Sequence, residues 1–257
     1  MSDTHDADAP ETANIEGVAS ELAAADHAVA LTGAGVSTAS GIPDFRSEGG
    51  IWDEFDPKQF RYSRFQAEPA AFWRERVEMR EAAFGGDVTP NAAHRALAEL
   101  EAAGVLDAVI TQNTDGLHAA AGTESIVELH GTGARVVCEN CRTRVDADPV
   151  HDRVREGEMP PRCRDCDGLL KPDVVLFGEQ LPQGALQTAQ THAREADVFL
   201  AVGSSLQVQP AASLPRVAGR NGTLVVINLE STPVSDVADY DLRADVTDAL
   251  PALAARV

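Results

Sequence analysis

The sequence predicts an α/β protein whose main body is a doubly wound parallel sheet, interrupted by two insertions. Short apolar runs alternate with helix-like stretches along most of the chain, which is typical of a parallel sheet covered by helices on both faces. The alternation is broken at about residues 46–85, which are rich in aromatics and arginine, and again at about 133–170. In a sheet of this kind, ligands bind at the carboxyl ends of the strands.

The first elements set up a turn at such a strand end. Apolar residues at helical spacing predict a helix over Ile15–Ala25, and the run Ala28–Leu31 predicts a buried strand. The strand leads into Thr32-Gly-Ala-Gly35, a glycine turn that suggests a phosphate cradle. The motif does not continue as GxGxxG, because Thr38 occupies the third glycine position. No acid follows a second strand at the required distance either, so a hydride-transfer dehydrogenase is disfavoured.

The later elements continue the alternation. Helices are predicted over Ala92–Ala103 and Ala185–Glu195, each placed near an apolar run. The apolar runs predict further strands of the parallel sheet at Leu106–Thr111, Asp173–Phe177, Val198–Val202 and Thr223–Asn228, with a strand-like stretch at Ile126–Leu129.

Composition restricts the possible partners. The 257 residues can bury one large core or two modest ones. The formal charge is −20, from 41 Asp and Glu against 21 Lys and Arg, and the only lysines are Lys58 and Lys171. This balance argues against direct nucleic-acid binding through a basic face. It resembles adaptation to high salt, with an ordinary acidic surface as the alternative.

The N-terminal residues 1–12 are acidic and polar, and we expect them to form a disordered tail. They have none of the features of a signal or transit peptide, and no apolar run is long enough to span a membrane. A cytoplasmic protein with no membrane association is therefore expected.

The four cysteines of the chain stand as Cys138-x-x-Cys141 and Cys163-x-x-Cys166, separated by 21 residues. This spacing is typical of a tetrahedral structural zinc site, in which each CxxC turn supplies two thiolates. Two disulfides or a redox pair are weaker alternatives, because nothing indicates secretion and neither CxxC follows a strand in a βαβ pattern. Residues 133–170 are therefore predicted to form a zinc module that one metal ion holds together.

Several motifs at the predicted strand ends occur in a distinctive order. They are the run 33–46 (GAGVSTASGIPDFR), the run 111–118 (TQNTDGLH), His130-Gly131, the four cysteines, the run 171–179 (KPDVVLFGE), the run 203–211 (GSSLQVQPA) and Ile227-Asn228. Together they resemble the sirtuins, NAD-dependent protein deacylases, over about residues 14–250. The resemblance implies a Rossmann-like large domain at about 13–45, 86–132 and 171–257, with a helical insertion and a smaller inserted zinc-binding domain.

The resemblance also implies where NAD binds. Phe45 would shield the bond to the nicotinamide ribose, unless it is merely a core residue. Asp115 would hold the nicotinamide carboxamide and Asn113 would order the reacting ribose. Thr114 departs from the usual Ile or Val and could alter nicotinamide affinity. The complete set of expected NAD contacts is Ala34, Thr38, Phe45, Arg46, Gln112, Thr114, Asp115, Ser204, Ser205, Asn228, Glu230, Asp245 and Val246.

His130 stands where the family keeps its general base. In the mechanism that the resemblance implies, the acyl-lysine carbonyl oxygen attacks C1′ of the ribose and nicotinamide departs. His130 then removes a ribose proton so that the 2′-hydroxyl can attack, and an imidazole suits this role. His118, in the DGLH run, is expected to be structural. The zinc is also expected to be structural, because four thiolates leave no open coordination position.

The substrate is expected to bind beside the run 171–179. Val175, Phe177 and Gly178 resemble the acyl-lysine tunnel, and they belong to the edge with which a substrate peptide pairs, with 206–208 on its other side. Desuccinylating sirtuins carry Tyr-x-x-Arg in the first insertion, where this chain has Trp73-x-x-Arg76. Arg76 could contact a carboxylate on the acyl group, or pair with a neighbouring acid on a solvated helix face.

The expected function is removal of acetyl groups from protein lysines at the expense of NAD, giving nicotinamide, 2′-O-acetyl-ADP-ribose and free lysine. Other acyl groups, or ADP-ribosyl transfer, are alternatives of the same class. A catalytically silent NAD sensor or a zinc-ribbon interaction module is a different class. The set of Asn113, Asp115 and His130 argues against this second class, because a protein that only binds has no need of a base.

Overall fold

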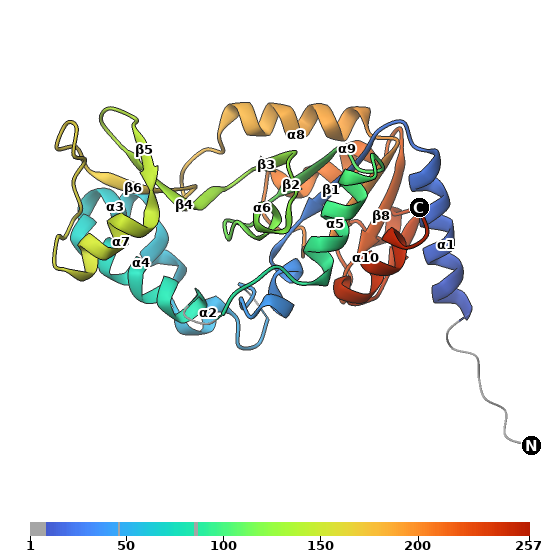
Figure 1. Cartoon of the computed structure of the whole chain (residues 1–257), viewed down its shortest axis with the longest axis horizontal. Coiled ribbons are helices and arrows are strands. Elements are labelled where there is room, and N and C mark those ends of the chain that lie inside the picture. The colour runs from blue at the N-terminus through green and yellow to red at the C-terminus, as the bar shows by residue number, and fades with distance from the viewer. Residues whose placement is uncertain (1–8, 46, 85–86) are drawn as a thin grey trace, which may run out of the picture.

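The computed structural model describes residues 9–45, 47–84 and 87–257, which form a large and a small domain side by side (Figure 1). The large domain is built on a six-stranded parallel sheet in the order β3-β2-β1-β7-β8-β9. The strands are β1 (Ala28–Thr32), β2 (Ala108–Thr111), β3 (Ile126–Glu128), β7 (Val198–Val202), β8 (Thr223–Ile227) and β9 (Tyr240–Leu242).

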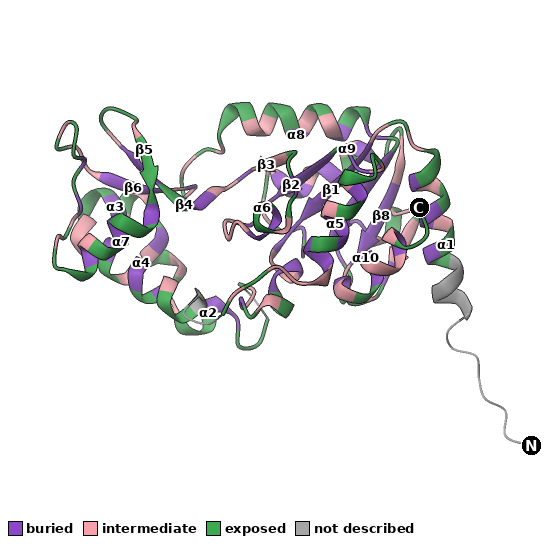
Figure 2. Cartoon of the chain, in the orientation of Figure 1, coloured by how far each residue is buried: buried purple, intermediate pink, exposed green. Residues whose placement is uncertain are grey.

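Helices cover both faces of this sheet, as its continuous apolar strands require. Side chains alternate along each strand, so that Ala28 and Ala30 of β1 face one core while Val29 and Leu31 face the other. Figure 2 shows the strands as a buried layer between half-exposed helices. One face is covered by α1 (Ala9–Ala24), α5 (Ala92–Ala102) and α10 (Val246–Ala254), and the other by α8 (Gln183–Glu195) and α9 (Leu214–Ala218).

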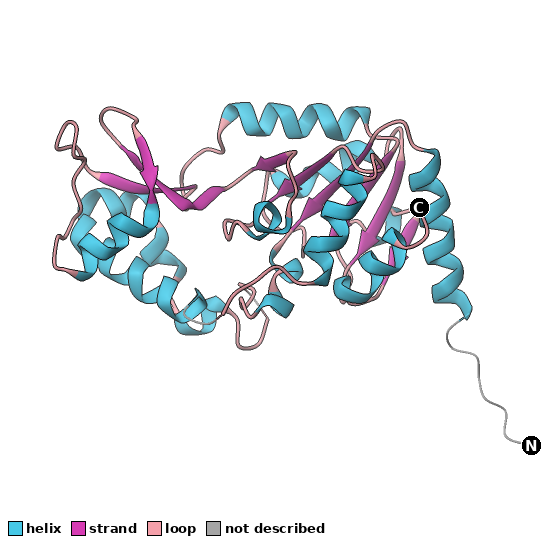
Figure 3. Cartoon of the chain, in the orientation of Figure 1, coloured by secondary structure: helices cyan, strands magenta, loops and turns pink. Residues whose placement is uncertain are grey.

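The small domain combines the two insertions in one core. Its sheet is antiparallel in the order β5-β4-β6, and helices from both insertions pack against it (Figure 3). Trp73 of the first insertion is fully buried there, and its indole N–H donates to the Leu170 carbonyl at 2.9 Å. The elements are α2 (Ile51–Glu54), α3 (Tyr62–Ala67), α4 (Pro69–Phe84), β4 (Gly131–Cys138), β5 (Arg144–Asp146), α7 (Ala147–Arg155) and β6 (Leu170–Val174).

Two predictions differ from the structure. Helix α1 begins at Ala9, so residues 9–12 are helical where a disordered tail was expected; residues 1–8 lie outside the described chain. The strand predicted at Asp173–Phe177 lies earlier, as β6, and pairs antiparallel with β4 in the small sheet rather than joining the parallel sheet. Because β6 is an edge strand, it tolerates Pro172, which has no N–H to donate.

Within the described part of the chain, no helix has both the length and the apolar character needed to cross a bilayer.

Candidate functional site

The site is centred where the order of strands reverses. β1 lies between β2 and β7, so the turns that follow β1 and β7 meet at the crevice in which doubly wound sheets bind ligands. The glycines of the first turn permit this close approach. A Cβ on Gly33 would lie 2.7 Å from the Ser204 Cβ, and one on Gly35 would lie 2.9 Å from the Gly203 carbonyl oxygen. The Gly33 and Gly35 N–H groups are taken up in this approach, because they donate to the Val202 and Gly203 carbonyls at 3.1 and 2.9 Å. The role of this turn as a phosphate cradle stays a prediction.

Ser37 joins the residues expected around the nicotinamide ribose. Its hydroxyl donates to the Asp115 carboxylate at 2.7 Å and accepts from the Asn113 side-chain amide at 3.2 Å. The same Asn113 amide donates to the Gly33 carbonyl at 3.0 Å. Asn113 and Asp115 are therefore held in fixed orientations by the turn after β1. The sequence motif contained Ser37, but nothing in the sequence alone assigned it this role.

Two buried histidines contact the turn after β1 and the end of β1. The His94 Nε2 lies 3.5 Å from the Ser37 Oγ, and the His118 Nε2 lies 2.9 Å from the Thr32 Oγ1. Because the Ser37 hydrogen is already donated, His94 is the donor in their contact, and its Nδ1 accepts from the Asn91 N–H at 3.4 Å. Burial lowers the pKa of His94 to about 4 and that of His118 to about 3, so both rings are neutral near pH 7.

Gln112 connects the site to the turn after β7. Its side-chain amide donates to the Ser204 hydroxyl at 2.9 Å, and the Leu206 N–H donates to the same oxygen at 3.3 Å. The hydroxyl hydrogen of Ser204 is then free to donate to a ligand oxygen. Leu206 has a positive φ of 50°, a conformation that L-residues rarely adopt, and this hydrogen bond helps to hold it.

His130 lies between the two sheets with its ring oriented. Its Nδ1 is 2.8 Å from the Gln112 carbonyl oxygen, which can only accept, so Nδ1 carries the proton and Nε2 is the basic atom. Burial lowers the pKa of His130, and the hydrogen bond to Gln112 partly opposes this. The His130 carbonyl accepts the Val175 N–H at 2.8 Å. Gly131 follows with φ 73°, at a point where a Cβ would meet the Asp173 carbonyl oxygen at 2.1 Å.

An aromatic wall runs from Phe45 to Phe177 through Trp52. The ring centroids of Phe45 and Trp52 are 5.2 Å apart, and those of Trp52 and Phe177 are 5.8 Å apart. Phe45 is 37% exposed and Phe177 43% exposed, so the alternative that Phe45 is a core residue is wrong. No pattern in the sequence connects Trp52 with either phenylalanine, so its place in this wall could not be predicted.

The Phe177 backbone is already paired within the chain. Its N–H donates to the Phe60 carbonyl at 3.1 Å, and its carbonyl accepts the Tyr62 N–H at 3.0 Å. The neighbouring Gly178 and, across the site, Gln207 make no backbone hydrogen bond among the described residues. The backbone groups open to a substrate strand therefore lie at Gly178 rather than Phe177.

The residues expected at the adenosine end lie at the carboxyl ends of β8 and β9. Asn228 follows β8, and its side-chain amide donates to the Glu230 carbonyl at 2.9 Å. Asp245 precedes α10 and accepts from the Thr247 hydroxyl at 2.7 Å and from the Thr247 N–H at 2.8 Å, and these contacts lower the pKa of Asp245. Val246 is buried directly behind it.

The remaining NAD candidates differ in accessibility. Thr38 and Ser205 are exposed, whereas Ala34 is half-buried. Thr114 is also half-buried, and its carbonyl accepts the Gly133 N–H at 2.8 Å. Arg46 lies outside the described residues.

Among the described residues Arg76 forms no ion pair with an acid, so the alternative of a pair on a solvated helix face is wrong. Its neighbour Glu75 instead pairs with Arg64 at 3.1 Å. The Arg76 Nε is buried and has no hydrogen-bond partner among the described residues. Burial lowers the pKa of Arg76 to about 10, and the positive charge of Arg80 adds to this effect. A Cβ on Gly133 would lie 3.7 Å from the Arg76 Nη2, so the guanidinium lies beside β4.

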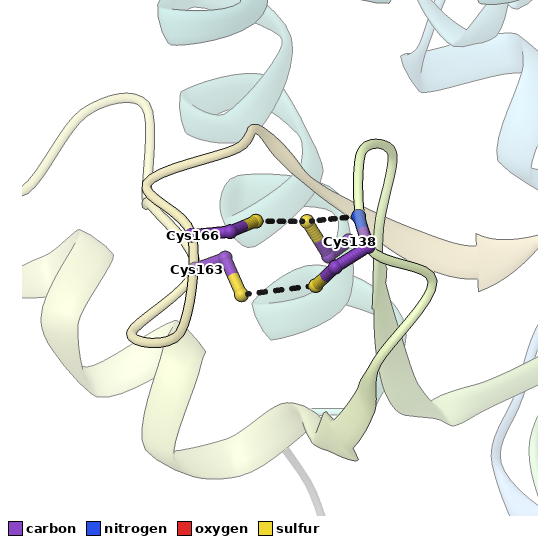
Figure 4. Close-up of side chains that lie close together, drawn as sticks. Cys138, Cys163 and Cys166 are labelled. Atoms are coloured by element: carbon purple, nitrogen blue, oxygen red, sulfur yellow. Dashed lines mark hydrogen bonds between the residues drawn. The ribbon is translucent and has the colours of Figure 1, made fainter.

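The four cysteines converge at the far end of β4, with all their sulfur atoms within 4.8 Å of one another (Figure 4). The Sγ atoms of Cys138 and Cys166 are 3.5 Å apart, and those of Cys141 and Cys163 are 3.7 Å apart. A tetrahedral zinc with Zn–S bonds of about 2.3 Å requires S–S separations of about 3.8 Å, so the cluster fits this metal. Burial raises the pKa of Cys138 to about 11. Metal binding therefore has to displace that proton.

The cysteine cluster is separated from His130 by the length of β4. This strand spans Gly131–Cys138, which corresponds to about 20–25 Å at the rise of an extended strand. A metal there cannot polarise a group beside His130, and its role is structural.

Comparison with known proteins gives one consistent relationship. The Sir2 family matches residues 33–210 of the chain. A curated relative, the NAD-dependent protein deacetylase of the halophilic archaeon Haloarcula marismortui, is 55% identical over 99% of both chains. A solved Sir2 structure with a peptide and NAD+ is 38% identical, with a TM-score of 0.83 over 92% of this chain and 95% of that one.

A second solved structure is a Sir2 variant with a deacetylated peptide and 3′-O-acetyl ADP-ribose. It is 37% identical, with a TM-score of 0.85 over 93% of this chain and 96% of that one. The resemblance and the doubly wound fold predicted from the sequence are confirmed. The chain belongs to the Sir2 family.

Proposed function

We propose that this protein is an NAD-dependent protein-lysine deacetylase that releases nicotinamide, 2′-O-acetyl-ADP-ribose and free lysine. The observation that carries the proposal is the orientation of His130. Its Nδ1–H is fixed on the carbonyl of Gln112, the residue that precedes Asn113, so its basic Nε2 is left to accept a proton. A protein that only binds NAD would not need an oriented, neutral imidazole at this point. The relative from Haloarcula marismortui and the solved Sir2 complexes support the same reaction class.

Each residue of the site has a chemical role in this proposal. Asp115, held by Ser37, accepts a hydrogen bond from the nicotinamide carboxamide, and Asn113 orients the reacting ribose. His130 takes the ribose proton on Nε2 while the Gln112 carbonyl stabilises the protonated ring. Because burial lowers its pKa, His130 is unprotonated at neutral pH and ready to act as a base. Gln112 and Ser204 contact the other ribose and the phosphates.

The acetyl-lysine side chain enters between the base and the aromatic wall. Val175 is joined to the His130 carbonyl through its own N–H, so the acyl site and the base share one backbone contact. Phe177 and Phe45 are bridged by Trp52 and together keep water from the reacting carbon. The substrate backbone pairs with the open groups of Gly178 on one side and Gln207 on the other. Backbone pairing of this kind tolerates many substrate sequences.

The acyl group is acetyl in this proposal, although Arg76 gives the site some capacity for an acidic acyl chain. The partner is an acetylated-lysine protein, and we place the enzyme in the cytoplasm, which matches the character of its sequence. The zinc holds the small domain together and takes no part in the chemistry.

Mass spectrometry of the products tests the proposal. The protein is incubated in high salt with NAD and with acetylated, propionylated and succinylated versions of one peptide. We expect free lysine peptide, nicotinamide and acetyl-ADP-ribose in equal amounts, with none formed when NAD is omitted. ADP-ribose transferred to the peptide or to the protein, without loss of the acetyl group, would assign the site to ADP-ribosyl transfer instead.

A further inference from the structure

A charged cavity of about 390 Å³ adjoins the proposed substrate edge on the small domain. Val175, Glu179 and Gln180 line it, so it continues the path of a peptide whose acetyl-lysine lies beside Val175. The small sheet contributes its opposite wall. Its lining carries four cations and four acids, among them Arg135, Arg142, Arg144 and Asp173.

The cations and acids of this cavity are not equally exposed. The side chains of Arg135, Arg142 and Arg144 are 45%, 62% and 53% exposed. The acids that they contact, among them Asp173 at 15%, are 15–32% exposed. The carboxylates therefore form the floor, and the guanidinium groups form the surface that a partner would meet.

The arginines keep donors available. Among the described residues, the Arg144 side chain makes one hydrogen bond, from Nε to Asp173 at 2.8 Å, and the Arg142 side chain makes one, from Nη1 to Glu139 at 3.3 Å. Both terminal nitrogens of Arg144 are therefore open to a ligand. A guanidinium with free terminal N–H groups is well suited to bind a carboxylate through two hydrogen bonds.

The floor beneath them is fixed. The buried Lys171 ammonium donates to the Val174 carbonyl at 2.7 Å and to the Glu179 carboxylate at 3.0 Å. Glu179 also accepts the Leu176 N–H at 2.8 Å. Asp173, which Arg135 and Arg144 contact, therefore lies in the same fixed segment as the substrate edge.

We propose that this cavity binds acidic side chains flanking the acetylated lysine, so that the enzyme prefers substrates with Glu or Asp near the modified residue. The inference rests on the proposed function, because it places the peptide at the edge described above. On a chain of net charge −20, exposed arginines gathered at one place favour an acidic peptide by charge complementarity. A nucleic acid would meet the same arginines, but the acidic remainder of the surface would repel its extended phosphate backbone.

The test uses acetyl-lysine peptides that differ only in flanking charge. Glu, Gln or Lys is placed on the N-terminal side in one set and on the C-terminal side in the other. We expect at least one Glu set to bind about 1.4- to 5-fold more tightly than its Gln counterpart by fluorescence anisotropy. In turnover the gain should appear in KM rather than kcat, because the contact is the same in the ground and transition states. Added salt should reduce the difference.

Variants locate the effect. The double variant Arg142→Gln with Arg144→Gln should lose the preference for Glu while turning over the Gln peptide as the wild type does. Arg164→Gln is the matched control, since Arg164 is a 75% exposed arginine of the same module outside the cavity, and it should keep the preference. Arg144→Lys, which preserves the charge, should keep part of it.

Equal binding of the Glu, Gln and Lys peptides would overturn the inference, as would a preference that survives in the double variant. A DNA oligonucleotide that displaces the Glu peptide at lower concentration than unlabelled Glu peptide would overturn it in favour of nucleic acid. The proposed function fails in a different way. If no peptide is deacetylated while binding still depends on charge, the deacetylase assignment is wrong and the cavity assignment stands.

Discussion

Acidification should destabilise this protein, because the folded chain holds three buried histidines in the neutral form. His94, His118 and His151 are 0%, 2% and 2% exposed. Burial lowers their pKa values to about 4, about 3 and about 4. In the unfolded chain each is expected to titrate near pH 6.5. As the pH falls below that value, the unfolded chain gains protons that the folded chain does not accept.

The sign and size of the effect follow from this difference. Stability is greatest above the unfolded pKa, declines as the pH falls below about 6.5, and levels off below the folded values. At pH 5 each histidine lowers the free energy of unfolding by about 2 kcal/mol relative to its value above pH 6.5. This figure hardly depends on how far below 5 the pKa of the folded state lies. The three together remove about 6 kcal/mol, which is comparable with the whole stability of a typical domain, about 5–15 kcal/mol.

The free energy of unfolding is measured by denaturant titration with circular dichroism at pH 7.5 and pH 5, at one fixed salt concentration. The variant His151→Gln isolates one contribution, because its loss between the two pH values should be smaller than that of the wild type by about 2 kcal/mol. Each protein is its own reference at pH 7.5. Equal stability of the wild type at both pH values, or an unchanged loss in the variant, would refute the reasoning.

Three further predictions concern the site and the metal. His130→Ala should bind NAD normally by calorimetry but lose turnover by about 10²- to 10⁴-fold. In the wild type, kcat/KM should decline only below about pH 6.5, since burial lowers the pKa of the base. Turnover of His130→Ala within a few-fold of the wild type would exclude His130 as the base. Cys141→Ala should lose the one zinc per chain expected from elemental analysis, together with helicity and activity, because metal binding and folding are coupled; a folded, active, metal-free variant would contradict a structural zinc. Acetyl-lysine should be preferred to succinyl-lysine in kcat/KM. Arg76→Ala should leave deacetylation nearly unchanged while lowering the residual desuccinylation by about 10- to 150-fold, the equivalent of about 1.5–3 kcal/mol. A succinyl preference in the wild type that disappears in this variant would reverse the assignment of the acyl group.

The sequence was sufficient to predict the parallel sheet and the metal site, for a local reason. The buried strands are continuous apolar runs, and Val198–Val202 was predicted with the bounds that the structure shows. The four cysteines are informative because two CxxC turns at that spacing have few other uses. Each signal is carried by short segments of the chain, an apolar run in one case and a CxxC turn in the other.

Features that depend on distant contacts could not be predicted in the same way. An apolar run is equally consistent with either sheet, so β6 was assigned to the wrong one. Ser37 acquires its role only when β1 and β2 bring it beside Asn113 and Asp115. In the part of the chain that the structure describes, the Arg76 Nε has no partner because it is buried, and the many charges of α4 concealed this burial.

The core shared by the two insertions has a consequence for protein engineering. Trp73 of the helical insertion and Leu170 at the end of the zinc module are joined by a hydrogen bond within one set of packed side chains. A chimera that exchanges residues 46–85 alone between relatives would therefore join two halves of a core that were selected separately. Exchanges meant to transfer acyl selectivity should replace residues 46–85 and 133–174 together. The segment to exchange is then the whole small domain rather than either insertion alone.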